Sequence, residues 1–238
     1  MVSIDITLDF KTECPEKGKD PDVYSPSLRQ YHKVLWSKPL PDGTIFELDA
    51  SGSPVSRYLV HESARGTIRL SSDSITTRML NRPRVRKLVE ELPEGAVRPH
   101  RGYTIGSALV FPANRVQGRM TINGARGFLL TIADRFDLTL ECIRRHYAGE
   151  TSPLARTLEE HSLFFALFED FENYVEFFLL QDLLTSSGTI DYWLPFQDFR
   201  RSAVPKTSSD YVRFRSATEN FIDRRNQRVE AWTREHLS

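Results

Sequence analysis

Two β-rich runs followed directly by a helical pattern constrain the fold of this chain more than any other feature. The runs cover Tyr103–Phe111 and Val116–Ile122, and the helical pattern covers Thr131–Tyr147, where apolar residues recur every three or four positions. This spacing predicts a helix with one buried face, placed after a hairpin. The polar tetrapeptide Asn123–Arg126 lies between hairpin and helix. Backbone amides at such a junction are free to bind, so we expect a polar site suited to a phosphate-bearing partner.

The remaining patterns predict a sheet-rich N-terminal half and a helical C-terminal half. Strict alternation over Ile4–Phe10 predicts a half-buried strand. Shorter strands are expected at Thr44–Leu48, Val55–His61, Thr67–Leu70 and Thr189–Leu194. Helices are expected at Leu28–Trp36, Arg84–Leu92, Ser152–Glu169, Phe171–Leu184 and Ser208–Leu237. We therefore predict one α+β domain over residues 1–238, with a mixed, mostly antiparallel sheet of about five or six strands.

The composition argues against several classes of protein. No apolar run approaches the roughly 20 residues that cross a bilayer, and the first residues lack the segments of a signal peptide. Cys14 and Cys142 are the only cysteines and the six histidines are dispersed, so no disulfide framework or His/Cys metal centre is expected. An Asp-based Mg²⁺ site stays open. We expect a cytoplasmic protein without membrane contact, metal or cofactor.

A formal net charge of zero conceals a basic central region. Residues 78–126 hold ten Lys or Arg and three Glu, a local net charge of +7, and acidic residues are frequent after Glu159. A basic face attracts a polyanion, and DNA is the expected partner. Scattered surface arginines in salt bridges are the alternative. We assign phosphate contacts to Arg84, Lys87, Arg101, Arg115 and Arg126.

Four residues are candidates for chemistry. Asp20, on a Pro-containing loop, could activate water or stabilise a cationic sugar, and an exposed acidic turn is the alternative. Asn123 could read a base edge, although Asn before Gly is also typical of a tight turn. Asp73 lies in a predicted turn, Ser71–Ser74, that could bind phosphate or cap a helix. Asp137 falls on the polar face of the predicted helix, where solvation or pairing with Arg144 or Arg145 is the simpler role.

Three further residues complete the candidate site. Arg135 flanks the buried face of the predicted helix, and a half-buried arginine needs a fixed anionic partner such as phosphate. Tyr24 and Tyr103 could stack on a base.

Three strings of the sequence carry a family resemblance. They are Gly18–Gly43 (GKDPDVYSPSLRQYHKVLWSKPLPDG), Leu70–Ser74 (LSSDS) and most of Gly102–Tyr147. Through them the chain resembles, over nearly its full length, an uncharacterised bacterial domain-of-unknown-function family, a likeness that implies no activity by itself. The Gly-x-Asp-Pro portion of the first string resembles the water-activating loop of uracil-DNA glycosylases. The chain departs from that pattern because the preceding strand ends at Phe10 and the partner His-Pro-Ser motif is absent. The family resemblance further suggests antiviral DNA glycosylases directed at modified phage bases.

These observations give one main hypothesis and two alternatives. The main hypothesis is N-glycosidic removal of a modified base from DNA in antiphage defence, which requires the base to be flipped out of the duplex. Asn123 would read the base and Asp20 would act on the sugar, with Asp73 and Asp137 as substitutes. The first alternative is a transferase or hydrolase of a small nucleotide. The second is a non-enzymatic nucleic-acid-binding module that uses the basic face.

Overall fold

The computed structural model describes residues 4–16, 18–45, 59–63, 66–113 and 120–236. These residues form helices and one small antiparallel sheet, and the C-terminal half is helical. The predicted α+β class is therefore confirmed. None of the helices in the described ranges is both long enough and apolar enough to span a lipid bilayer.

The N-terminal segment folds into turns, so the strand predicted at Ile4–Phe10 is wrong. The carboxylate of Asp5 accepts a hydrogen bond from the Thr7 backbone N–H at 2.8 Å, and that of Asp9 accepts one from the Lys11 N–H at 3.0 Å. Aspartates that bond the backbone two residues ahead bend the chain into turns. Ile4 and Phe10, at the two ends of the segment, are nevertheless buried, as the alternating pattern predicted.

Two helices follow, α1 (Pro21–Tyr24) and α2 (Pro26–Trp36). Ser25 caps α2 because its hydroxyl accepts a hydrogen bond from the Leu28 N–H at 3.1 Å, and a proline occupies the first helical position. The predicted helix at Leu28–Trp36 is therefore confirmed.

The described part of the chain contains three strands in the spatial order β1 (Val60–Ser63), β2 (Gly66–Ser74) and β3 (Ala108–Pro112). Neighbouring strands are antiparallel, and Ser72 of β2 lies opposite Val110 of β3. The turn predicted at the end of β2 is wrong, because pairing with β3, which is buried along its whole length, keeps these polar residues extended.

The other strand predictions have mixed outcomes. Most of Thr44–Leu48 and Val55–His61 lies outside the described residues, as do residues 116–119 of Val116–Ile122. The run Tyr103–Phe111 contains a short 3-10 helix, η1 (Ile105–Ser107), before β3 begins. The predicted strand Thr189–Leu194 is wrong, because it forms only an isolated bridge from Ile190 to Leu184.

Helix α3 (Pro83–Glu90) confirms the prediction for this region, but Asn123–Arg126 belongs to a helix, α4 (Ile122–Phe128), rather than to a turn. Thr121 caps α4 by accepting a hydrogen bond from the Gly124 N–H at 3.1 Å. The next helix, α5 (Phe136–Tyr147), begins later than predicted. Two consecutive residues before it, Ala133 and Asp134, have positive φ angles of 52° and 64°, which a right-handed helix does not allow.

The C-terminal half is more broken than predicted. It contains the following short helices: α6 (Ala155–Glu159), α7 (Ser162–Phe165), η2 (Ala166–Phe168), α8 (Phe171–Phe177) and η3 (Gln181–Leu183). The helix expected over Ser152–Glu169 is broken between α6 and α7 and ends in a positive φ angle at Glu169 (63°), and a positive φ angle at Leu179 (55°) interrupts the helix expected over Phe171–Leu184.

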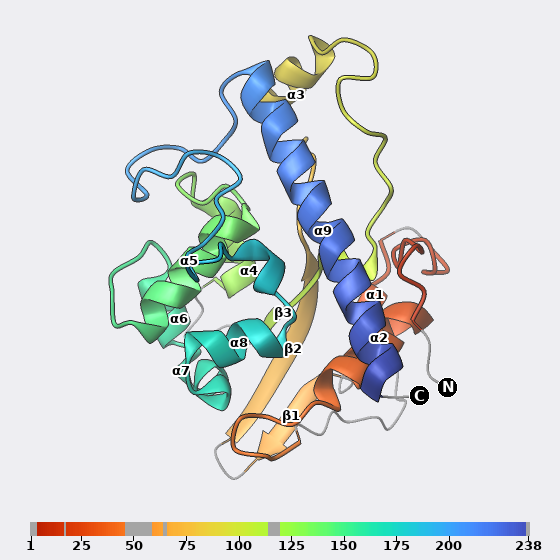
Figure 1. Cartoon of the computed structure of the whole chain (residues 1–238), viewed down its shortest axis with the longest axis vertical. Helices are drawn as coiled ribbons and strands as arrows, with labels where there is room; N and C mark the ends of the chain where they lie inside the picture. The colour runs from red at the N-terminus through yellow and green to blue at the C-terminus, as the bar shows by residue number, and fades with distance from the viewer. Residues whose placement is uncertain (1–3, 17, 46–58, 64–65, 114–119, 237–238) are drawn as a thin grey trace.

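The last helix, α9 (Ser208–His236), joins the two halves of the molecule. Buried Arg225 donates to the carbonyl oxygens of Gly106, Ala108 and Phe178 and to the Tyr31 hydroxyl. Figure 1 shows α9 running along the molecule, with α1 and α2 on one side of the strands and α4 to α8 on the other. The two faces of the sheet are therefore covered by different helices.

Candidate active site

The most unusual polar cluster is a buried arginine shared by two carboxylates. Nη1 of Arg126 lies 2.8 Å from Oδ2 of Asp73 and 2.7 Å from Oδ1 of Asp134. The same guanidinium donates to the Thr139 hydroxyl at 3.2 Å and to the Asp134 carbonyl at 3.1 Å. The Arg126 side chain is fully buried, whereas those of Asp73 and Asp134 are 36% and 25% exposed. Two carboxylates are thus held by one buried cation while both reach solvent.

Three separate elements position these groups. Asp73 lies on β2, paired with Leu109 of the buried strand β3. Arg126 lies in α4, and its carbonyl accepts a hydrogen bond from the Asp134 N–H at 2.9 Å. Asp134 adopts a left-handed conformation that is costly for a residue with a side chain. Strained backbone conformations are frequent at functional sites, and they persist only where the surrounding contacts hold the residue in place. The contacts with Arg126 hold Asp134 in this way.

The two carboxylates have different environments. Burial of the Asp134 carboxyl raises its pKa, and repulsion from Asp73 adds to the effect, against the opposing attraction of Arg126 and Arg82. One oxygen of Asp73 and one oxygen of Asp134 contact the same Arg126 nitrogen. The two carboxylates therefore lie close enough together to contact the same group of a bound substrate. A pair of neighbouring carboxyls with unequal environments can act as a general acid and a carboxylate at the same pH.

Asn123 belongs to the same region. It precedes Arg126 by three residues in α4, a spacing that places two side chains on the same side of a helix. Its Oδ1 atom is buried and accepts no hydrogen bond from any described residue. A buried acceptor without a partner is costly, so a ligand donor at this position would be favourable.

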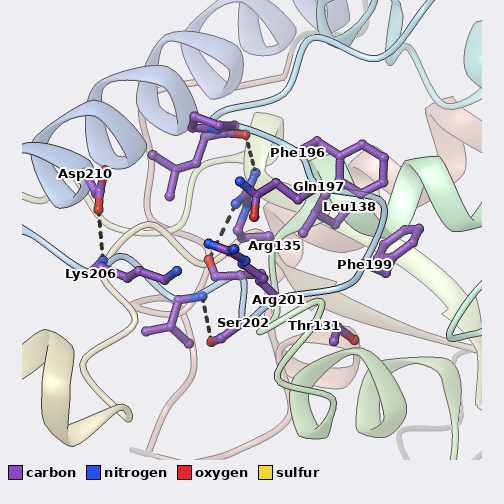
Figure 2. Close-up of a pocket in the computed structure, with 14 residues that line it drawn as sticks. Thr131, Arg135, Leu138, Phe196, Gln197, Phe199, Arg201, Ser202, Lys206 and Asp210 are labelled. Atoms are coloured by element: carbon purple, nitrogen blue, oxygen red, sulfur yellow. Dashed lines mark hydrogen bonds between the residues drawn. The ribbon is translucent and has the colours of Figure 1, made fainter.

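A second feature, which we call the Arg201 hollow, lies beyond the loop that carries Asp134. Its volume is about 200 Å³, and Thr131 and Arg135 from this loop contribute to its wall. The other residues come mainly from the segment 194–206, together with Leu138 and Asp210. Figure 2 shows Arg135, Arg201 and Lys206 turned toward the hollow, with Phe196 and Phe199 on the other side.

Comparison with known proteins gives the chain a family. Residues 4–229 match the model of a family of unknown function, DUF6994. The chain belongs to this family. No curated protein and no solved structure matched it. The expected membership in a domain-of-unknown-function family is therefore confirmed, and membership in DUF6994 implies no activity.

In this DUF6994 member, a polar network on the opposite face of the sheet separates Asp20 from the Arg126 cluster. Nε2 of buried His32 lies 2.7 Å from the Ser72 hydroxyl and 3.4 Å from Oδ1 of Asp22. The Ser72 N–H donates to the other Asp22 oxygen at 2.8 Å. Since successive strand residues point to opposite faces, Ser72 and Asp73 face different sides of β2. The network is not a catalytic relay, because Ser72 and Asp22 meet the same ring nitrogen rather than opposite ones.

Asp20 therefore does not meet Asn123 or Arg126. It caps α1, where its carboxylate accepts a hydrogen bond from the Asp22 N–H at 3.0 Å. Burial and the neighbouring Asp22 raise the pKa of Asp20. Its assignment as the principal catalytic carboxylate is corrected, because a helix cap on the far face of the sheet cannot act with Asn123.

Asp137 and Arg135 form a buried structural pair, so their predicted catalytic and nucleic-acid-binding roles are corrected. The Arg135 guanidinium is bound to both Asp137 oxygens, and the same carboxylate accepts a hydrogen bond from the Trp193 N–H at 3.1 Å. The side chains are only 3% and 0% exposed. The fixed anionic partner that was expected for Arg135 is thus a carboxylate of the chain itself.

The other predicted nucleic-acid contacts are dispersed. Arg84 and Lys87 are exposed on α3, and Arg84 donates to the Lys206 carbonyl at 3.1 Å, beside the Arg201 hollow. Arg101 is exposed and contacts Asp223 at 3.5 Å. Arg115 lies outside the described residues. Arg126 is fully buried between Asp73 and Asp134, so its direct contact with phosphate is corrected to a role in holding these carboxylates.

The two predicted stacking tyrosines lie away from the Arg126 cluster. Tyr24 is 40% exposed on α1. Tyr103 packs against Phe10, and the Lys11 ammonium lies 3.5 Å from its ring centre. Lys11 thus covers one side of the Tyr103 ring.

The sequence did not single out Asp134 or the segment 196–201. Asp134 lies within the predicted helical pattern Thr131–Tyr147, and no local signal reveals its left-handed conformation. The string Phe196–Arg201 (FQDFRR) did carry a signal, since two aromatic residues close to two arginines suit stacking and phosphate contact. In the described part of the chain, no group of three or more His, Cys, Asp or Glu could hold a metal ion.

Proposed function

We propose that this protein hydrolyses the N-glycosidic bond of a nucleotide in DNA, with modified phage bases as its substrates. The observation that carries the proposal is the pair of solvent-reaching carboxylates, Asp73 and Asp134, held by one buried arginine. Enzymes that cleave glycosidic bonds through two neighbouring carboxyls keep them roughly 5–5.5 Å apart when one of them contacts the sugar directly. Because the two oxygens lie 2.8 and 2.7 Å from one Arg126 nitrogen, they are at most about 5.5 Å apart, which is compatible with direct contact between one carboxylate and the sugar.

Asp134 has the properties of the general acid. Burial raises its pKa above that of an ordinary aspartate, and in its protonated form it donates its proton to the leaving base as the bond between C1′ and nitrogen breaks. The bonding electrons leave with the base, so positive charge develops on the sugar. The Asp73 carboxylate stabilises that charge, and a water adds to C1′. The proton released by this water restores the acid, so the products are the free base and an abasic sugar.

The other residues position the substrate. Asn123 offers its unpaired acceptor to an amino group on the base edge. The exposed cations Arg84 and Lys87 on α3 favour the phosphate backbone. This surface supports DNA as the substrate in preference to a neutral sugar.

The direct test is the formation of abasic sites. Purified protein is incubated with phage genomes that carry different modified bases, and alkali-induced strand breaks are counted. Asp73→Asn and Asp134→Asn should each lower the rate by about 100-fold or more, since general acid–base groups contribute this much. Asp223→Asn on α9 is the matched control, because the Asp223 side chain is 36% exposed, as that of Asp73 is, and also contacts arginine; this change should leave the rate unchanged. Absence of alkali-sensitive sites in every modified genome would overturn the proposal.

A second candidate is a nucleic-acid-binding module without chemistry, which the cationic and aromatic lining of the Arg201 hollow favours. Phage protection in cells separates the two. If Asp73→Asn and Asp134→Asn cells stay protected while Arg201→Gln cells do not, binding alone is the function.

A further inference from the structure

The Arg201 hollow has a shortage of negative charge. Three cationic side chains line it, those of Arg135, Arg201 and Lys206. Arg135 is neutralised by Asp137. Neither the Arg201 guanidinium nor the Lys206 ammonium contacts a carboxylate of any described residue. Converging cations without a counter-ion favour binding of an anion, and phosphate suits an arginine fork best.

The one acidic side chain in the wall does not remove this imbalance. Asp210, in the first turn of α9, accepts hydrogen bonds from the backbone N–H groups of Lys206 and Thr207, each at 3.1 Å. Its carboxylate is therefore used to fix the chain that enters α9. Figure 2 shows this contact at the edge of the hollow, with the Lys206 side chain extending inward.

Aromatic rings form the opposite wall. Phe196 stacks on Tyr192 with ring centres 4.4 Å apart, and Phe199 meets Phe196 edge to face at 4.9 Å. The Arg145 guanidinium lies 5.1 Å from the Phe199 ring centre and is bound to Asp198 at 2.6 Å. The rings are thus held in place before any ligand arrives.

The hollow continues outward into a space that can take an aromatic ring. A second, open hollow of about 600 Å³ shares Phe196, Gln197 and Arg201 with the first. The inner part alone, at about 200 Å³, is below the usual size of a small-molecule site, roughly 300–1,000 Å³. Together the two parts provide room for a phosphate and a ring.

We infer that the Arg201 hollow binds one nucleotide, with its phosphate between Arg201 and Lys206 and its base on Phe196 and Phe199. The exposed amide of Gln197, between the two rings in sequence, offers a donor and an acceptor to the base edge. The choice of a nucleotide, in preference to another phosphate that carries an aromatic ring, rests on the proposed function. The loop that carries Asp134 also lines the hollow through Thr131 and Arg135, so this nucleotide is a neighbour of the one that is cleaved.

Calorimetric titration of the full chain at low salt tests the inference. The probes are inorganic phosphate, the four deoxynucleoside monophosphates and a short single-stranded oligonucleotide. We expect the monophosphates to bind more tightly than phosphate, because only they contact the rings. Arg201→Gln should weaken them by about tenfold or more, the effect of losing one charge-assisted contact. Phe199→Leu should weaken the monophosphates but leave phosphate binding unchanged.

Arg156→Gln is the matched control, since Arg156 is 76% exposed on α6 and should bind all probes as the wild type does. Tighter binding of the oligonucleotide identifies a DNA strand as the source of the nucleotide, and equal binding identifies a free nucleotide. Monophosphate binding that is absent, or unchanged by Arg201→Gln, overturns the inference.

The same titration of Asp73→Asn separates the two proposals. Normal binding by this variant, with no abasic sites formed by the wild type, refutes only the proposed function. Abasic-site formation without binding in the hollow refutes only the nucleotide subsite.

Discussion

Replacing Arg126 with methionine tests the role of the buried guanidinium directly. Arg126→Met fills a similar volume but leaves Asp73 and Asp134 facing each other without their shared cation. Removing one partner of a buried ion pair costs about 3–5 kcal/mol. Both carboxylates reach solvent and can regain hydration, so we expect the low end, about 3 kcal/mol. For a chain of this size that loss lowers the melting temperature by roughly 6–12 °C.

The measurement is urea denaturation, followed by circular dichroism, at neutral pH. Arg84→Met is the matched control, because Arg84 is exposed and makes one backbone contact, so its cost should stay within about 0.5 kcal/mol. Arg126→Lys keeps the charge but loses the fork of donors and should fall between the two. A loss below about 1 kcal/mol for Arg126→Met would refute the view that this residue holds the carboxylates.

Three further predictions concern the fold. A Cβ on Gly106 would collide with the Ile222 carbonyl and the Asn226 side chain, whereas one on Gly127 in α4 meets nothing within 4 Å. Thermal melts should therefore show Gly106→Ala destabilised by about 1–3 kcal/mol and Gly127→Ala unchanged or more stable. Equal effects of the two substitutions would contradict this. Asp137→Asn should cost about 3 kcal/mol in urea denaturation by leaving Arg135 buried without its counter-charge, and a cost near zero would argue against a structural pair. Burial lowers the pKa of Lys38 to about 8, so the folded chain loses this proton before the unfolded chain does. The free energy of unfolding of the wild type relative to Lys38→Met should therefore rise from about pH 8 to pH 10, and a flat difference would contradict the buried ammonium.

Local signals predicted the helices with clear caps and the general class of the fold. The helix expected at Leu28–Trp36 corresponds to α2, which Ser25 and Pro26 cap, and the helix expected at Ser208–Leu237 corresponds to α9. The failures have tertiary or conformational causes. The polar end of β2 stays extended only because β3 pairs with it, and the left-handed residues Ala133 and Asp134 delay α5. Neither cause is visible in propensity or pattern.

The candidate site was half predictable from sequence. Asn123 and Arg126 were recognised as neighbours of functional interest, and Asp73 was named as a substitute for Asp20. Their association with Asp134 depends on a long-range contact between β2, α4 and a strained loop, which spacing alone cannot reveal. The buried partner of Arg135 was missed for a related reason, because Asp137 was assigned to the solvated side of its helix while the segment around Trp193 covers it.

The pKa of Asp134 tests the central claim most directly. Carbon-detected NMR titration of the aspartate side chains gives this value in the wild type and in Asp73→Asn. We predict a pKa above the usual range for aspartate in the wild type, because burial and the Asp73 charge both raise it. Removing that charge should lower the pKa of Asp134 in Asp73→Asn. An ordinary pKa for Asp134 in the wild type, unchanged by the substitution, would contradict the assignment of a coupled acid and carboxylate.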